Sequence, residues 1–146
     1  MSFEVFLETA WSEHGHDPKL AAAKLSAAFD QLQTAQQAVA LLQFAEHVLV
    51  GHLGQFAEAN AFYKKFRTLE YPDILIVHQA VTCAETVLRL TQEDSAPVEV
   101  LSKSDQVRVY SISASLLAER KNIERAKSHF EKAASLAEMP PSDEVQ

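Results

Sequence analysis

Apolar residues recur along most of this chain with the three- and four-residue spacing of one helix face. Signals for helix starts and ends divide them into stretches of helical length. We expect helices over about residues 3–15, 17–33, 34–53, 55–70, 73–91, 102–120 and 122–138. The pattern at 93–104 fits either a loop or a loop with one short helical turn. No stretch alternates as a half-buried strand does, so the sequence predicts an all-α fold of about six or seven helices.

Capping residues mark several of the expected helix ends. Asp17 stands before Pro18, and proline is well tolerated at the first helical position because the N–H that it lacks would have no partner there. Thr34 and Gln37 have the spacing of a capping box, in which each side chain accepts from the other residue's backbone N–H. Gly54 can adopt the left-handed conformation that ends a helix. These signals predict antiparallel helices joined by short turns.

Two segments of the chain are similar to each other. Residues 54–66 (GQFAEANAFYKKF) and 121–133 (KNIERAKSHFEKA) align without gaps at an offset of 67 positions, close to two units of about 34 residues. Each follows a long apolar segment after a turn of one or two residues. The matched positions are Phe56 with Ile123, Ala59 with Ala126, Tyr63 with Phe130, and Lys65 with Lys132.

These segments resemble the second helix of a tetratricopeptide repeat. The alanines occupy the position where that helix closely contacts its partner, and Tyr63 and Phe130 occupy the aromatic position. In the last unit the preceding helix also matches, with Tyr110 and Ala114 at its large and small positions. The unit at 34–70 has His47 where a small residue is expected, and the unit at 72–103 lacks the second-helix signature.

The resemblance implies antiparallel helix pairs stacked in a right-handed α–α superhelix. It covers about half of the chain directly, and the opening pair at 3–33 is similar in shape only. We expect one domain over residues 1–139, followed by a flexible tail at 140–146. A generic helical bundle that uses similar amphipathic patterns is the alternative.

Composition narrows the class of protein. With 47% hydrophobic residues and a mean hydropathy of −0.10, the chain of 146 residues is typical of a water-soluble globular domain. A net charge of −7 repels the phosphate backbone of a nucleic acid. The N-terminus lacks the basic region of a signal peptide, and the uncharged stretch 31–45 is too short to span a bilayer. We therefore expect no nucleic acid and no membrane among its partners, and a cytoplasmic location.

The sequence contains no recognisable catalytic or cofactor motif. His47 and His52 lie five residues apart, which separates them by about 140° around an α-helix of 3.6 residues per turn. His14 and His16 lie in an expected turn, so the histidines are interpreted as packing and capping residues. Cys83 is the single cysteine and lies among apolar residues. We expect no metal, no cofactor and no enzymatic activity.

In tetratricopeptide-like stacks, the first helix of each pair lines a concave surface that receives a peptide, and the resemblance implies such a groove here. The groove would be apolar at one end and polar at the other, which suits an amphipathic or extended peptide. The predicted groove residues are Leu41, Phe44, Val48, His52, Val77, Val81, Arg108, Ser111, Ser115 and Glu119.

The resulting hypothesis is a non-enzymatic interaction module, such as an adaptor, chaperone or regulatory subunit, that binds a partner protein or peptide. A structural homo-oligomer, in which exposed apolar helix faces pair with themselves, is an alternative. A further alternative is a small-molecule-binding or enzymatic bundle that uses Trp11, His47 and His52.

Overall fold

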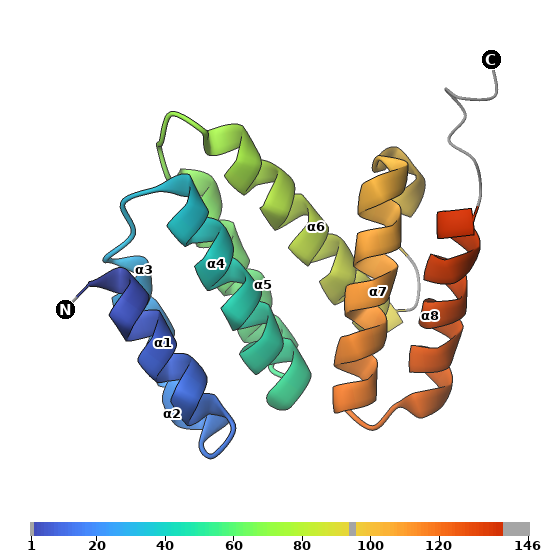
Figure 1. Ribbon diagram of the computed structural model, residues 1–146, viewed down its shortest axis with the longest axis horizontal. Coiled ribbons are helices and arrows are strands. Elements are labelled where there is room, and N and C mark those ends of the chain that lie inside the picture. The colour runs from blue at the N-terminus through green and yellow to red at the C-terminus, as the bar shows by residue number, and fades with distance from the viewer. Residues whose placement is uncertain (1, 94–95, 139–146) are drawn as a thin grey trace. The chain divides into compact units, whose positions relative to one another are not determined.

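The computed structural model describes residues 2–93 and 96–138, and this part of the chain is built from helices (Figure 1). Helices account for 81% of the residues and no strand occurs in the described ranges, which confirms the expected all-α fold. These ranges contain eight α-helices, because the expected helix at 17–33 is divided in two at Lys24. The expected tail at 140–146 lies outside the described residues.

The chain divides into two compact units, Met1–Glu85 (unit 1) and Thr86–Gln146 (unit 2). The boundary falls inside α6 (Ile74–Glu93). The single domain expected over 1–139 stays a prediction.

Unit 1 consists of short helices joined by short connections. Its elements are α1 (Phe3–His14), α2 (Pro18–Ala23), α3 (Leu25–Phe29), α4 (Ala35–Ala45), the π-helix η1 (Glu46–His52), α5 (Phe56–Lys65), the 3-10 turn η2 (Phe66–Thr68) and the first part of α6. The expected caps are present: Asp17 Oδ1 accepts from Leu20 N (3.0 Å), and Thr34 Oγ1 accepts from Gln37 N (3.1 Å). Because these caps satisfy backbone N–H groups locally, the starts of α2 and α4 are predictable from the sequence.

The interior of unit 1 is formed mainly by α4, η1, α5 and η2. Its largest fully buried side chains include Leu41, Phe44, Val48, Tyr63 and Phe66. Each apolar side chain of this size stabilises the fold by about 1.5–3 kcal/mol when it is removed from water. These residues carry the apolar stripes expected from the sequence, so the stripes mark the core of unit 1.

The π-helix η1 departs from the expectation of one α-helix over 34–53. Leu53 N donates to Val48 O (3.0 Å), a bond that spans five residues instead of four. Gln55 N then donates to Leu49 O (2.7 Å), and Gly54 has the expected left-handed φ of 61°. A π turn inserts one extra residue into a helix, and such turns are frequent at functional sites. The insertion changes which side chains after residue 45 share a face.

Unit 2 contains the end of α6, the 3-10 turn η3 (Val98–Val100), α7 (Lys103–Glu119) and α8 (Ile123–Glu138). The short turn η3 is the single helical turn considered for 93–104, and Ser102 Oγ caps α7 by accepting from Asp105 N (3.1 Å). α7 and α8 pack together along their lengths (Figure 1). Arg125 joins α8 to the end of α6 by donating to the carbonyls of Thr91 (2.9 Å) and Leu90 (2.7 Å).

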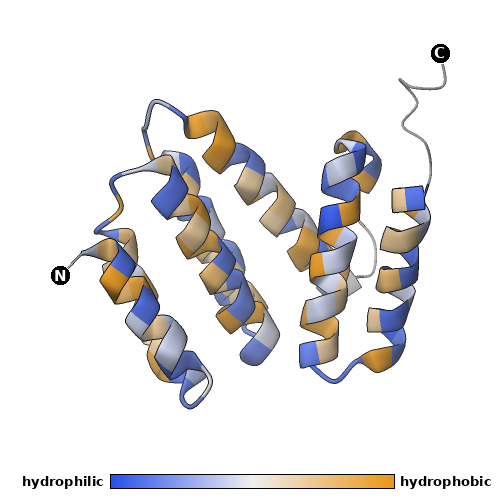
Figure 2. Ribbon diagram, viewed as in Figure 1, coloured by the Kyte–Doolittle hydropathy of each residue, from blue (hydrophilic) through white to orange (hydrophobic). Residues whose placement is uncertain are grey.

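In the described part of the chain, α6 alone has the length and composition that could cross a membrane, at residues 74–92. Half of that window is buried inside the structure, as in the core helix of a water-soluble protein. Its first turn is apolar (Figure 2), and Leu75 and Ile76 there are exposed.

Candidate functional site

The apolar residues of the predicted groove lie in the interior of the structure. Leu41, Val48, Val77 and Val81 are fully buried, and Phe44 is 1% exposed. Such side chains are surrounded by their neighbours and offer no surface to a partner. The apolar half of the predicted groove is therefore corrected to core. The cause is that an apolar stripe has the same sequence pattern whether it faces a core or an open groove.

The polar residues of the predicted groove lie on α7 in unit 2. Arg108, Ser115 and Glu119 are exposed and Ser111 is half-buried. Ser115 Oγ donates to the carbonyl of Ser111 (3.2 Å). Their spacing places them along one side of the helix. As a binding surface these four residues stay a prediction, confined to unit 2.

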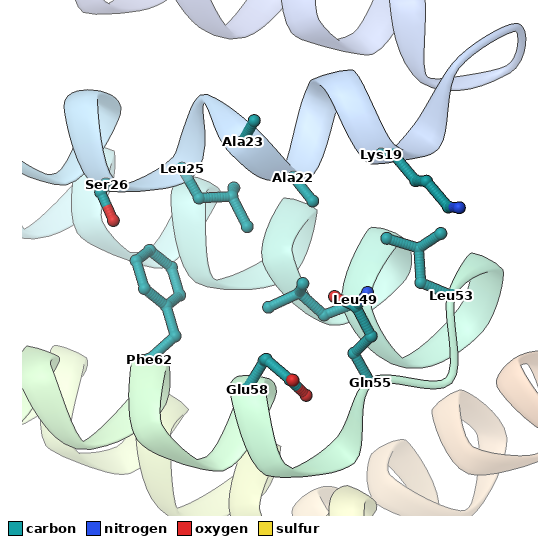
Figure 3. Close-up of a pocket in the computed structure, with 10 residues that line it drawn as sticks. All are labelled: Lys19, Ala22, Ala23, Leu25, Ser26, Leu49, Leu53, Gln55, Glu58 and Phe62. Atoms are coloured by element: carbon teal, nitrogen blue, oxygen red, sulfur yellow. The ribbon is translucent and has the colours of Figure 1, made fainter.

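A groove opens in unit 1 at another place, between α2 and α3 on one wall and η1 and α5 on the other (Figure 3). Its volume is about 420 Å³, within the usual range of binding pockets. We call it the unit 1 groove. It is lined by Lys19, Ala22, Ala23, Leu25, Ser26, Leu49, Leu53, Gln55, Glu58 and Phe62.

The unit 1 groove has an apolar floor and charged rims. Leu25, Leu49 and Phe62 form the floor and are 4%, 5% and 7% exposed, so each presents a small part of its surface to the groove. Figure 3 shows Leu25 and Phe62 on opposite walls. Lys19 on α2 and Glu58 on α5 are exposed. An open apolar surface between opposite charges can hold an amphipathic segment in one orientation.

Small side chains on the α2–α3 wall leave the space that forms this groove. Ala22 and Ser26 line it, where larger residues would fill it. Between them Lys24 ends α2, and its ammonium forms an ion pair with Glu13 of α1 (2.5 Å). The lysine is thus held toward α1, so the groove wall between residues 22 and 26 carries no long side chain apart from Leu25.

A cluster of three histidines is the second feature of unit 1. Nε2 of His47 and Nε2 of His52 are 3.1 Å apart, and one ring nitrogen from each of His14, His47 and His52 lies within 4.8 Å of the others. All three side chains are half-buried. The Trp11 ring lies with its centroid 4.8 Å from that of His14, 5.3 Å from His47 and 4.9 Å from Phe44. We call His14, His47 and His52 the histidine cluster.

The sequence grouped Trp11, His47 and His52 only as an alternative site, and it did not predict the cluster of three histidines because α-helical geometry was assumed through residue 53. Hydrogen bonds in η1 span five residues, which brings His47 and His52 to neighbouring positions on one side of the helix. The separation of about 140° expected for an α-helix is thus corrected. His14 comes from the last residue of α1, and no local pattern connects it with residues more than thirty positions later. The five-residue spacing of His47 and His52 was the available signal.

A serine and a histidine also meet inside unit 2. Nδ1 of His129 is 2.7 Å from Oγ of Ser113, and this hydroxyl donates to the carbonyl of Tyr110 (3.0 Å). With the hydroxyl proton donated to the Tyr110 carbonyl, Nδ1 is the donor toward Oγ. Ser113 is fully buried. This pair joins α7 to α8 inside unit 2.

Tyr63 and Glu46 are two further titratable residues buried in unit 1. Burial raises the pKa of the Tyr63 phenol well above its usual value, and the charge of Glu46 raises it further. The Tyr63 hydroxyl has no hydrogen-bond partner among the described residues. The phenol therefore stays neutral at physiological pH and contributes packing.

Comparison with models of protein families finds no match, and neither the curated proteins nor the solved structures give a significant match.

Proposed function

We propose that this protein is a non-enzymatic interaction module of the tetratricopeptide-like kind, which binds an amphipathic helix of a partner protein in the unit 1 groove. The observation that carries the proposal is the open groove of about 420 Å³ with the apolar floor of Leu25, Leu49 and Phe62. Open apolar surfaces of this kind are typical of binding sites, since water contact at such a surface is unfavourable. The proposed right-handed stacking of helix pairs is supported by the buried small residues Ala59 and Ala126.

The groove suits apolar side chains of a partner helix better than a polar ligand. Each large apolar side chain that leaves water there contributes about 1.5–3 kcal/mol to binding. The rim charges then determine direction: an acidic residue of the partner faces Lys19 and a basic residue faces Glu58. Exposed ion pairs add little affinity, but they select among orientations and partners.

A protein is the proposed partner class. The net charge of −7 disfavours nucleic acid, and the groove is too small to represent a membrane-binding face. A cytoplasmic location is part of this proposal.

The groove can be tested with a displayed library of amphipathic helical peptides. Ala22 points into the groove (Figure 3), so Ala22→Trp fills it. We expect selected peptides to bind the wild type and to lose about tenfold or more in affinity for Ala22→Trp, equivalent to one lost apolar contact of about 1.4 kcal/mol. Lys19→Glu should change the preferred flanking residue of the peptide from acidic to basic.

Arg108→Glu provides the matched control, because Arg108 is exposed on α7 and outside the unit 1 groove. Affinity should be unchanged in this variant. A loss with Arg108→Glu and none with Ala22→Trp would assign binding to α7 and contradict the proposal. Circular dichroism of each variant shows whether the helices are retained.

A homo-oligomer is the second candidate, because α8 exposes an apolar stripe. Ile123 (63% exposed) and Phe130 (48% exposed) lie seven residues apart on one side of this helix. Figure 2 shows the apolar start of α8. Light scattering over a concentration series tests this candidate: self-association that Phe130→Glu abolishes supports it, and a monomer at every concentration excludes it.

A further inference from the structure

We propose that His14, His47 and His52 bind a divalent transition-metal ion, and that Zn²⁺ fits this ligand set best. The site uses none of the residues that line the unit 1 groove. It joins the end of α1 to η1, so a bound ion would link two elements that are distant in the sequence.

The distances within the histidine cluster are close to those of a metal site. Imidazole nitrogens bind Zn²⁺ at about 2.0–2.1 Å, which puts two ligands of a tetrahedral ion about 3.3 Å apart. The Nε2 atoms of His47 and His52 are already 3.1 Å apart. The widest separation in the cluster is 4.8 Å, so a movement of about 1.5 Å completes the ligand set.

The hydrogen bond of His14 orients its ligand atom. Nδ1 of His14 lies against the backbone carbonyl of Trp11. A carbonyl oxygen only accepts, so Nδ1 carries the proton and the lone pair is on Nε2. Metal-binding histidines commonly donate their other N–H to a carbonyl in this way, which determines both tautomer and ring orientation. Trp11 is therefore a positioning residue for His14.

The π-helix supplies the other two ligands from one face. η1 places His47 and His52 side by side, although they are five residues apart. The Trp11 ring packs beside His14 and His47, and Phe44 packs against Trp11. This aromatic packing restricts the imidazoles of His14 and His47, so less entropy is lost when an ion fixes them.

The chemistry of the ligands selects the class of metal. Imidazoles favour Zn²⁺, Cu²⁺, Ni²⁺ and Co²⁺, whereas Ca²⁺ and Mg²⁺ require oxygen ligands. In the described ranges the group contains neither carboxylate nor thiol, and Cys83 is not one of its members. Three protein ligands leave one position of a tetrahedral ion for water or another donor. Closed structural zinc sites use four protein ligands, so three histidines match the open type of site.

The proposal is tested first on untagged full-length protein, because a histidine tag would itself bind the ion. Calorimetric titration with Zn²⁺ should show one equivalent bound. Trp11 is the single tryptophan, and its ring centroid lies within 5.3 Å of the centroids of His14 and His47, so one equivalent of Co²⁺ or Cu²⁺ should quench its fluorescence. Zn²⁺ should displace Co²⁺ and restore the emission. Bound Co²⁺ should also give the visible absorption of a tetrahedral site.

Single variants then identify the ligands. His14→Ala and His52→Ala should each lower the Zn²⁺ affinity at least about 100-fold. Loss of a group that only hydrogen-bonds to a metal ligand already lowers metal affinity about 10- to 100-fold, and loss of the ligand itself should cost more. His16→Ala is the matched control, since His16 is exposed, adjacent in sequence and outside the cluster. Its affinity should equal that of the wild type.

Circular dichroism of the metal-free variants separates loss of a ligand from loss of the fold. The wild-type measurement is decisive even where a variant does not fold: an absence of Zn²⁺ binding together with unquenched Trp11 emission overturns the proposal. It is also overturned if His16→Ala weakens binding as much as His14→Ala does, or if a folded His47→Ala/His52→Ala variant still binds one equivalent with wild-type affinity.

Discussion

The α4–α5 pair of unit 1 and the α7–α8 pair of unit 2 turn from one helix to the next in the same way. Gly54 (φ 61°) and Lys121 (φ 69°) are both left-handed, and they lie at the 67-residue offset of the sequence repeat. Ala59 and Ala126 follow at equal distances and are 0% and 3% exposed. The sequence similarity thus corresponds to a shared local structure, a left-handed turn followed by a helix with a buried small residue.

The two pairs differ in the helix before the turn. Gln55 N donates to Leu49 O, six residues earlier, whereas Asn122 N donates to Leu117 O, five residues earlier. The additional residue in unit 1 is the one that η1 inserts, while α7 stays α-helical to Glu119. One inserted residue thus leaves the turn intact and changes which side chains meet. In unit 1 the result is the histidine cluster.

A second difference concerns the outer face of the second helix. Tyr63 is fully buried, but Phe130 at the matching position is 48% exposed. The matched aromatic residues therefore have unequal environments, although the matched alanines do not. The sequence repeat predicts the close contact between the two helices of a pair. Burial of the second helix's outer face depends instead on whether another element packs against that face.

Truncation of the matched aromatic residues should give the largest difference in stability between the two helix pairs. Tyr63→Ala removes a fully buried ring, so we expect a loss of about 3–5 kcal/mol in the free energy of unfolding. Phe130→Ala should change it by less than about 1 kcal/mol, because half of that ring is already in water. Urea unfolding followed by circular dichroism measures both, and equal losses would contradict the comparison.

Tyr63→Phe is the control for this pair, because it keeps the ring and removes a hydroxyl without a hydrogen-bond partner among the described residues. Its stability at neutral pH should equal or exceed that of the wild type by about 1 kcal/mol. The raised pKa of Tyr63 in the folded state adds a dependence on pH. The unfolded phenol ionises near pH 10, so the wild type should lose stability as the pH rises above this value, and Tyr63→Phe should lose less.

Much of the helical framework could be predicted because its signals are local. Asp17, Thr34 and Ser102 each cap the helix that follows them, and capping depends on residues within one turn. The division at Lys24 was not predicted, since the apolar stripe continues across it. The π turn was not predicted either, because apolar residues fill Leu41 to Leu53 densely enough to fit several helical periods.

The candidate sites could not be predicted because they depend on contacts between distant elements. The unit 1 groove requires the α2–α3 wall to face α5, and nothing local to Ala22 or Phe62 indicates this. The residues placed in the predicted groove, such as Val48 and Val77, are buried by neighbours that periodicity does not identify. His14 reaches His47 through the packing of α1 beside α4. Periodicity identifies an apolar face but not its partner.

Substitutions at the two left-handed turn residues, Gly54 and Lys121, should have the smallest effects on the free energy of unfolding, and these effects should have opposite signs. Gly54→Ala places a Cβ on a left-handed residue, so we expect a loss of about 1 kcal/mol. Lys121→Gly removes a Cβ from the same conformation and should gain about 0.5–1 kcal/mol, because the relief of backbone strain exceeds the added entropy of the unfolded chain. Lys121→Ala is the control for the lost charge and should be close to neutral. Urea unfolding measures all three, and destabilisation by Lys121→Gly would show that the turns at 54 and 121 are not energetically equivalent despite their common geometry.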